Sequence, residues 1–460
     1  MSLVVRYFVL LSLFFGSVYV LLVPPFQAPD EAHHFYRIYH ISEGYWMGEK
    51  TDDQRFGGEL PKSLHELAMT FRYLRYNEAG KVNDEIWAKA KSIELQREET
   101  TFLDFPNVAY YVPMPYLPQA AAVWIGKQFE LQPLYLLYLT RFANLFIWIA
   151  LITFALRILP FHQWTIAALA LLPASLVFHS GINADAVTNG ACFLLIASLL
   201  SLIFSDEQLR WKHFGLLLIS ATITLAKVVY APIILLAWLI PIRKWKSKAT
   251  YFAVNVGVLL FHTFLLLWWS NIAGDLFIPY DEYNPEYRVD KQLNPGVDPM
   301  AQLSFILEEP SAFLTILFGS YAEIFPYTLL HYFGKFGWEG NYMPTWSIVL
   351  LGLTTAGVAI LEKPVPKSLQ LRQKIAFLVI GLGMMLAFSI VIYMQWNAPR
   401  DPQITALSGR YFIPIFPFFF LALVNGKWQV DFNWKVILII ILVATQLLMS
   451  QSIYLRYYAQ

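Results

Sequence analysis

Long apolar runs alternate along this chain with short polar connectors. A helix needs roughly 20 apolar residues to cross a bilayer, and several of these runs approach that length. The pattern predicts an all-α polytopic membrane protein with about 11 transmembrane helices. We expect these helices near residues 3–23, 134–156, 163–179, 187–204, 213–226, 231–241, 249–270, 344–361, 375–395, 411–425 and 434–452.

Three apolar stretches do not fit a simple crossing. Residues 213–241 are too long for one upright helix, and Lys227 and Pro232 interrupt them, so we expect two short helices there. The proline-rich run that ends near Phe129 is expected to be a re-entrant or interfacial helix, because a crossing there would reverse the side of every later connector. Residues 301–330 carry several glutamates and are expected to rest on the outer face of the membrane.

Composition supports a membrane protein and excludes several function classes. Hydrophobic residues make up 57% of the 460 residues and charged residues only 14%, which is too apolar for a soluble domain of this length. The formal net charge is +1, so no surface for nucleic acid is implied. The single cysteine, Cys192, lies in an apolar run and can form no disulfide within the chain.

Basic residues fall in alternate connectors, and this predicts the orientation in the membrane. Short cytoplasmic loops collect lysine and arginine. Arg6, Arg157, residues 243–248 and Lys374 should therefore face the cytoplasm. Residues 24–133 then form a large first loop on the extracytoplasmic face.

Loop lengths divide the chain into three parts. Residues 1–270 are expected to form a core module that includes the first loop, residues 24–133. Residues 271–343 form a second extracytoplasmic loop with interfacial helices, and residues 344–460 form the C-terminal transmembrane helices. Within the first loop, the charged residues 81–99 predict a surface helix, so we expect a small helical subdomain.

Ionisable residues gather directly after the first apolar helix. The segment PPFQAPDEAHHFYRIY, residues 24–39, places a carboxylate pair, Asp30 and Glu31, beside His33 and His34 at the membrane boundary. Charged side chains are costly there unless they are solvated or take part in binding or catalysis, so the cluster is a candidate catalytic centre. The alternative for the pair is a helix start, with Asp30 as N-cap and Glu31 favoured by the helix dipole.

The spacing of the histidines suggests a second role in the same cluster. A helix that starts at Asp30 puts His34 on the same face, with Arg37 one turn further. His34 is therefore predicted to orient Asp30 by a hydrogen bond or to hold a metal ion with it. The alternative is loop packing for one histidine and solvent exposure for the other.

Several blocks carry a family resemblance. A signal-anchor helix, the PPFQAPDEAHHFYR segment, a large loop with the run YYVPMPYLP, and a second outward loop HSGINADAV resemble the GT-C superfamily of polytopic glycosyltransferases. The blocks AKVVYAP, FGKFGWEGNYMP and LSGRYFIPIFP are similar to a bacterial subgroup of that superfamily known as a domain of unknown function. The resemblance covers nearly the whole chain. It implies a GT-C-like, multi-pass protein of a bacterial inner membrane, with its active site facing the periplasm or exterior.

The resemblance also implies a reaction. Its donor would be a sugar on a polyprenyl phosphate, and its acceptor a glycan, a lipid or a protein. Such transfer needs a base for the acceptor hydroxyl, cations for the leaving phosphate and a groove for the prenyl chain. Asp30 or Glu31 is the expected base, and the resemblance places Asp185 beside Asp30, although Asp185 also suits a plain helix N-cap. A divalent cation, Mg²⁺ or Mn²⁺, held by Asp30 and Asp185 is left open.

The remaining candidates are predicted to bind phosphate and sugar. Arg410 and Lys227 are outward cations that suit a phosphate, with a lipid headgroup as the alternative, and Gly409 is expected to permit a tight turn before Arg410. Trp338 is expected to stack on a sugar, with an interfacial anchor as the alternative. The full candidate substrate-binding set is His33, His34, Arg37, Asp185, Lys227, Tyr230, Trp338, Glu339, Arg410 and Tyr411.

A transporter or flippase for a lipid-linked glycan is the second function class. It explains the helix number equally well, but it predicts ionisable residues within helices on both leaflets, where they are exposed alternately. Here the unusual polar residues gather on the predicted outer side, which favours an enzyme. Release of polyprenyl phosphate from a lipid-linked sugar would discriminate the two classes.

Overall fold

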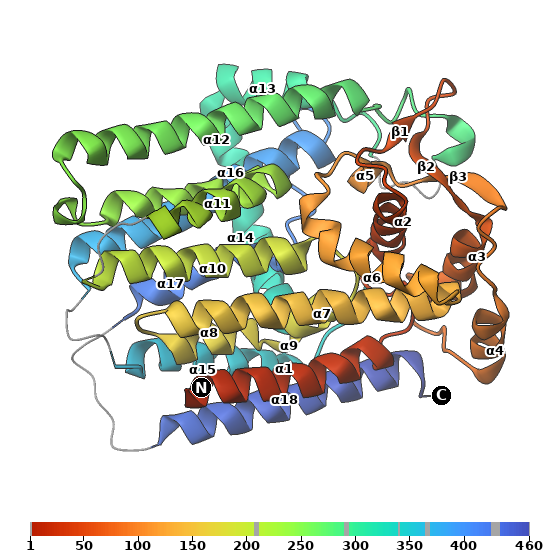
Figure 1. The fold of residues 1–460 in the computed structure, drawn as a ribbon, viewed down its shortest axis with the longest axis horizontal. Helices are drawn as coiled ribbons and strands as arrows, with labels where there is room; N and C mark the ends of the chain where they lie inside the picture. Colours follow the sequence, from red (N-terminus) through yellow and green to blue (C-terminus); the bar gives the residue numbers. More distant parts are fainter. Residues whose placement is uncertain are drawn as a thin grey trace.

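The structure is a computed structural model that describes residues 2–206, 211–288, 294–338, 341–363, 369–424 and 433–459, with only the backbone of residues 211 and 212. The described chain consists mainly of helices, with a small sheet in the first loop (Figure 1).

Among the described residues, seven helices are long and apolar enough to cross a membrane. Six of them match predicted crossings, and Figure 1 shows these six running in roughly the same direction. The prediction of a helical, multi-pass membrane protein is therefore confirmed. The seven are α1 (Leu3–Leu22), α7 (Pro133–Ile158), α10 (Asp185–Phe204), α12 (Lys248–Leu276), α14 (Pro310–Gly334), α16 (Leu371–Trp396) and α18 (Trp434–Tyr457).

The other predicted crossings are short or broken. The segment predicted at 163–179 is bent by 57° between α8 and α9, where Pro173 follows a residue that cannot continue the helix. The segment at 213–241 breaks at Lys227, as expected. The pieces are α8 (Gln163–Ala170), α9 (Pro173–Ser180), the 3-10 helix η3 (Trp211–Phe214), α11 (Gly215–Ala226), the 3-10 helices η4 (Val228–Leu239) and η5 (Ile242–Lys244), and α15 (Thr345–Leu361).

The prediction at 411–425 fails. Pro414 interrupts this run, and Pro417 lies in the first turn of the short helix that follows. Up to residue 424, the last described residue of the run, it holds only the 3-10 helix η7 (Gly409–Phe412) and the seven-residue helix α17 (Phe416–Ala422). The described chain therefore has seven helices of spanning length, or eight if α8 and α9 form one crossing.

The loop after α12, called the second loop below, contains two helices that the sequence placed on the membrane surface. After the 3-10 helix η6 (Pro285–Tyr287), the chain forms α13 (Pro299–Glu308) and then α14. The length and hydropathy of α14 suit a crossing, but Figure 1 shows it crossing the other long helices rather than running along them. It packs against α9, α15 and η7, so it supports the segment that carries Arg410.

The first loop contains a sheet that the sequence did not predict. Three antiparallel strands lie in the order β1-β2-β3, with Gly57 opposite Asp104. The strands are short and β2 contains two glycines, so the β-strand propensity of these segments is low and did not indicate a sheet. The predicted helix at 81–99 shrinks to α4, which Asn83 caps by accepting a hydrogen bond from the Ile86 N–H at 2.9 Å. The loop elements are α2 (Glu31–Ser42), β1 (Glu49–Lys50), β2 (Phe56–Pro61), α3 (Lys62–Phe71), η1 (Arg72–Leu74), α4 (Asp84–Ser92), β3 (Thr100–Asp104), α5 (Pro106–Ala109), η2 (Met114–Tyr116) and α6 (Leu117–Gln128).

The two ends of the helical body differ in chemistry. Figure 1 shows the first loop at the right end, where α1 ends and α7 begins, whereas α12, α16 and α18 begin at the opposite end. The first turns of these three helices carry Lys248, Lys374 and Lys435, and the last turn of α7 carries Arg157. These basic positions thus share one end of the body, opposite the first loop, as the sequence predicted.

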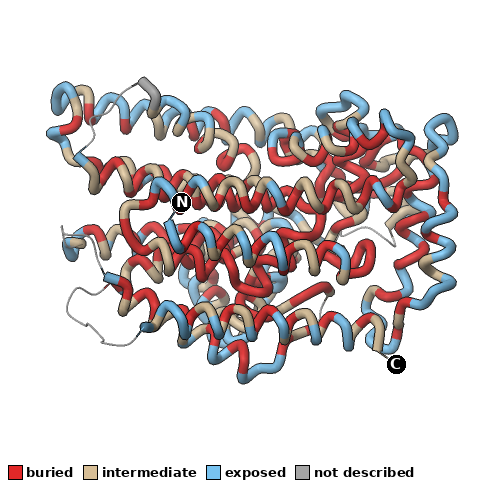
Figure 2. The backbone as a smooth tube through the Cα atoms, turned by 60° about the horizontal axis from the view of Figure 1, so that its bottom comes forward, coloured by how far each residue is buried: buried red, intermediate tan, exposed pale blue. Residues whose placement is uncertain are grey.

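Apolar side chains cover the outside of the body. Helix α12 exposes Phe252, Leu260, Phe264 and Leu267. Only 17% of its most apolar 18-residue stretch is buried. Figure 2 shows exposed and buried positions alternating along the outer helices. Apolar side chains exposed along a helix of this length are stable in lipid rather than in water.

Candidate active site

Asp30 lies where α1 gives way to α2, in an unusual backbone conformation. Its φ is 63°, in the left-handed region, which aspartate tolerates better than most residues. Asp30 holds the N-cap position of α2, but its side chain makes no capping hydrogen bond. Its Oδ2 instead lies 3.4 Å from Nη2 of Arg410. The N-cap alternative therefore does not describe this side chain, and a strained backbone of this kind is frequent at functional sites.

Glu31 has a different environment, fully buried among the helices. Nε and Nη2 of Arg141 donate to its two carboxylate oxygens, each at 2.7 Å, and the Ile182 N–H donates at 3.0 Å. Arg141 also donates to three backbone carbonyls at the end of α1. This pair ties α1, α2 and α7 together, so the geometry gives Glu31 a structural role. The sequence analysis missed Arg141, although an arginine inside an apolar helix is itself a signal.

Arg410 is held in place by the close approach of its segment to α14. A Cβ at Gly409 would lie 2.3 Å from the Tyr332 nitrogen and 2.5 Å from the Thr328 carbonyl oxygen. Gly409 does not have a positive φ, so the tight turn predicted from the sequence is not the reason for glycine. The reason is the contact between two backbones.

The Arg410 guanidinium lies among aromatic groups. It donates to the Tyr411 hydroxyl at 3.0 Å, and it lies 4.9 Å from the Tyr411 ring centroid and 5.6 Å from that of Phe178. Burial opposes its charge, but Tyr411 and Asp30 outweigh burial and raise the pKa of Arg410. Its Nε has no hydrogen-bond partner among the described residues. Arg410 thus stays charged in this environment.

Asp185 and Lys227 form a second carboxylate and cation pair. Asp185 is the first residue of α10, and its side chain contacts the Lys227 ammonium. The N-cap function belongs to Asn183, whose Oδ1 accepts from the Asp185 and Ala186 N–H groups at 2.9 and 3.0 Å. The plain N-cap alternative for Asp185 is therefore wrong.

Tyr411 joins the two pairs. The Lys227 ammonium lies 5.2 Å from the centroid of its ring, on which Arg410 also packs. The Tyr230 hydroxyl donates to the Tyr411 carbonyl at 2.8 Å. One cluster therefore contains six of the twelve predicted site residues: Asp30, Asp185, Lys227, Tyr230, Arg410 and Tyr411.

His34 borders this cluster. Its Nδ1 shares a hydrogen bond of 2.8 Å with the hydroxyl of Tyr116, a residue that the sequence analysis missed. Burial lowers the pKa of His34 to about 4, against the opposing effect of Asp30 and Asp185. His34 is therefore neutral at pH 7. Its described hydrogen bond reaches Tyr116 rather than Asp30.

The other two candidates on α2 make contacts within the first loop, and His33 lines the same cavity as Asp30. Nδ1 of His33 lies 2.5 Å from the side-chain oxygen of Asn107. Arg37 is fully buried and donates to the carbonyls of Trp46 at 2.5 Å and Tyr111 at 3.2 Å. Arg37 therefore stabilises the first loop.

Two cavities adjoin the contact between Asp30 and Arg410. Asp30 lines a cavity of about 360 Å³ formed by the first and second loops. Arg410 lines a smaller cavity together with Lys335, His331 and apolar residues of α1, α9 and α14. The contact at 3.4 Å therefore lies between two cavities that both have apolar walls with charged groups set into them.

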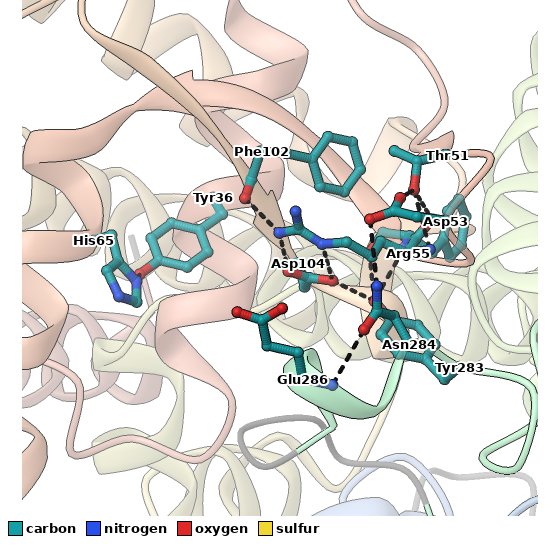
Figure 3. A network of polar contacts seen from close by, with 11 residues as sticks. Tyr36, Thr51, Asp53, Arg55, His65, Phe102, Asp104, Tyr283, Asn284 and Glu286 are labelled. Carbon is teal, nitrogen blue, oxygen red and sulfur yellow. Dashed lines mark hydrogen bonds and ion pairs between the residues drawn. The ribbon is translucent and has the colours of Figure 1, made fainter.

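An arginine and aspartate network forms one wall of the larger cavity (Figure 3). Arg55 donates to both oxygens of Asp104, at 3.3 and 2.7 Å, and its guanidinium lies 3.6 Å from the Tyr287 ring centroid. The Tyr283 hydroxyl donates to Asp104 at 2.5 Å, which docks the second loop onto the sheet. The sequence analysis missed this network. The only indication of it in the sequence was that the first loop is long and polar.

Trp338 lines the same cavity. Its Nε1 donates to the Phe26 carbonyl at 3.3 Å, and the Arg75 guanidinium lies 3.9 Å from its ring centroid. The neighbouring candidate, Glu339, lies outside the described residues.

The described residues do not fit the divalent cation that the sequence left open. Asp30 contacts Arg410 and Asp185 contacts Lys227, so each carboxylate faces a positive charge. Within the described ranges, no group of three or more histidine, cysteine, aspartate or glutamate side chains could hold a metal ion. Mg²⁺ takes near-octahedral oxygen ligands, and we derive no chemical step through a metal.

The fold and the site define a multi-pass helical membrane protein whose paired ionisable residues gather at one end. The chain belongs to the family described as "Predicted membrane protein (DUF2142)", whose sequence model matches residues 13–419. No curated protein and no solved structure matches the chain.

Proposed function

We propose that this protein is a membrane glycosyltransferase. It would move a sugar from a polyprenyl-phosphate donor to a glycan, lipid or protein acceptor on the extracytoplasmic face of a bacterial inner membrane. The observation that carries the proposal is the contact of Asp30 with Arg410, which joins a carboxylate on one cavity to a guanidinium on another. The resemblance of the sequence blocks to the GT-C superfamily supports the same function.

The smaller cavity suits the donor. Its volume of about 60 Å³ suits the phosphate end of a donor rather than a whole prenyl chain, and Arg410 and Lys335 supply positive charge for a phosphate beside the apolar residues Phe178 and Ile413. Arg410 keeps its charge in this environment. A planar guanidinium can also grip two phosphate oxygens at once.

In the proposed reaction, Asp30 accepts the proton of the acceptor hydroxyl. The acceptor oxygen bonds to the anomeric carbon of the sugar, and the bond from that carbon to the phosphate oxygen breaks. The electron pair leaves with polyprenyl phosphate, whose negative charge Arg410 stabilises. Asp30 then loses its proton to water. Glu31 is not assigned the base role, because Arg141 engages both of its oxygens.

Orientation follows from charge. The basic ends of α7, α12, α16 and α18 are expected in the cytoplasm by the positive-inside rule. The first loop and Asp30 then face the periplasm or the cell exterior.

The test is release of polyprenyl phosphate by the full chain, purified in detergent and supplied with lipid-linked sugars and acceptors from a bacterium that encodes it. Asp30→Asn should lower the rate by about 10² to 10⁴, which is what general base catalysis supplies. Asp52→Asn, at an exposed aspartate of the same loop, should leave it unchanged. No release by the wild type, or equal release by Asp30→Asn, would sink the proposal. Lipid translocation without release would support the alternative, a transporter or flippase.

A further inference from the structure

The larger cavity has recognition groups that the transfer step itself does not need. We propose that this cavity is the acceptor site, and that the acceptor is a saccharide rather than a lipid or a protein segment. The role of the cavity as an acceptor site rests on the proposed function, whereas its binding of a saccharide can be tested without any donor.

One wall presents a fixed arginine beside an aromatic face. Asp104 holds Arg55 through two hydrogen bonds, and the side chain of Arg55 is only 12% exposed. The Arg55 guanidinium lies 3.6 Å from the ring centroid of Tyr287. Figure 3 shows the Glu286 carboxylate, next to Tyr287, pointing into the space between Asp104 and Tyr36. Planar polar groups and a ring thus line one small volume.

A second arginine and aromatic pair comes from other elements. Arg75 follows η1, and its guanidinium lies 3.9 Å from the ring centroid of Trp338. The Trp338 ring also packs against Tyr76, with the centroids 5.4 Å apart. The Arg75 Nε is buried without a hydrogen-bond partner among the described residues. Arg75 and Trp338 line the same cavity as the first pair.

This combination matches the chemistry of a sugar. A sugar ring has apolar C–H faces that pack on aromatic rings, and its hydroxyls need fixed donors and acceptors. The cavity volume of about 360 Å³ lies in the range of small-molecule sites. An extended protein segment would need a much larger contact surface. The cavity has apolar and aromatic walls, but Arg55, Arg75 and Asp104 set charged groups among them, and such groups suit the hydroxyls of a sugar better than a lipid chain.

The cavity also leads to the proposed base. Asp30 lines it together with Tyr36 and Trp338. A saccharide bound against these rings would present a hydroxyl to Asp30, while the donor phosphate lies with Arg410 in the other cavity.

The experiment measures binding of the full chain, purified in detergent and without donor, to an array of bacterial envelope oligosaccharides, in parallel with lipid and peptide arrays. Wild type should bind a subset of the saccharides. Trp338→Ala and Arg75→Ala should each weaken that binding at least tenfold. Trp124→Ala, an exposed tryptophan on α6 that does not line the cavity, is the matched control and should leave binding unchanged. If thermal unfolding shows that Trp338→Ala is misfolded, Arg75→Ala alone decides the test.

Absence of saccharide binding by the wild type overturns the inference. So does saccharide binding that both variants retain, or binding to the lipid or peptide array that both variants abolish. The two proposals fail separately. Saccharide binding without release of polyprenyl phosphate overturns the enzyme but keeps the saccharide site, and release without saccharide binding does the reverse.

Discussion

Arg141 donates to both carboxylate oxygens of Glu31 at 2.7 Å, and both side chains are fully buried although each borders a cavity. Asp30, the preceding residue, instead contacts Arg410 at 3.4 Å at the edge of two cavities. Two adjacent carboxylates therefore have separate tasks. A buried pair with fully engaged oxygens stabilises the fold, whereas a carboxylate at a cavity can take part in chemistry.

Glu31→Gln should therefore destabilise the protein. Removing one partner of a buried ion pair leaves the other charge uncompensated, at a cost of about 3 to 5 kcal/mol. We expect a clear fall in the thermal unfolding temperature in detergent. Asp30→Asn, at a partly exposed side chain, should shift that temperature little. If Glu31→Gln unfolds like the wild type but has lost turnover, the base would be Glu31 rather than Asp30.

Arg410→Ala should weaken use of the lipid-phosphate donor. Loss of a charge-assisted hydrogen bond costs about 1.5 to 3 kcal/mol, equivalent to a roughly 10- to 150-fold rise in the donor concentration needed for half-maximal rate. Titration of the donor at fixed acceptor measures this change. Arg400→Ala is the control, because Arg400 is 60% exposed and pairs with Glu309 away from both cavities. Unchanged donor dependence in Arg410→Ala would leave Arg410 as a headgroup contact.

The orientation can be tested by thiol labelling. In a Cys192→Ser background, Asp53→Cys in the first loop should react with an impermeant reagent in intact cells or spheroplasts. Lys246→Cys, at the opposite end, should react only after the membrane is opened. Both positions are exposed, so burial does not limit the reaction. The reverse labelling pattern would invert the topology and place Asp30 in the cytoplasm.

Stability should depend on pH through His34. Its pKa falls from the ordinary 6.5 to about 4 because of burial, so the folded protein binds this proton less readily than the unfolded chain does. The stabilising effect is complete above pH 6.5 and is lost as the pH falls toward 4. The thermal unfolding temperature of the wild type should therefore fall as the pH is lowered from 6.5 to 4. That of His34→Gln should fall less. Equal slopes in the two proteins would show that His34 is solvated.

Much of the site could be predicted from residue types and their positions along the chain. A charged side chain next to an apolar run is costly at a membrane boundary, and this indicated Asp30, Asp185, Lys227 and Arg410. The structure brings these four residues into one cluster. Arg141 and Tyr116 were missed because their importance lies in the partner that each contacts. The network of Arg55 and Asp104 was missed for the same reason.

The sequence by itself determined the membrane-spanning helices α1, α7, α10, α12, α16 and α18 and the end at which basic residues gather, because the length of an apolar run and the positions of charges are local properties. Tertiary structure alone decided which charges pair. Asp30 and Arg410 are 380 residues apart, and Glu31 and Arg141 are 110 apart. Only packing can select one partner among many cations of equal charge, because the cost of burying an ion depends on what surrounds it.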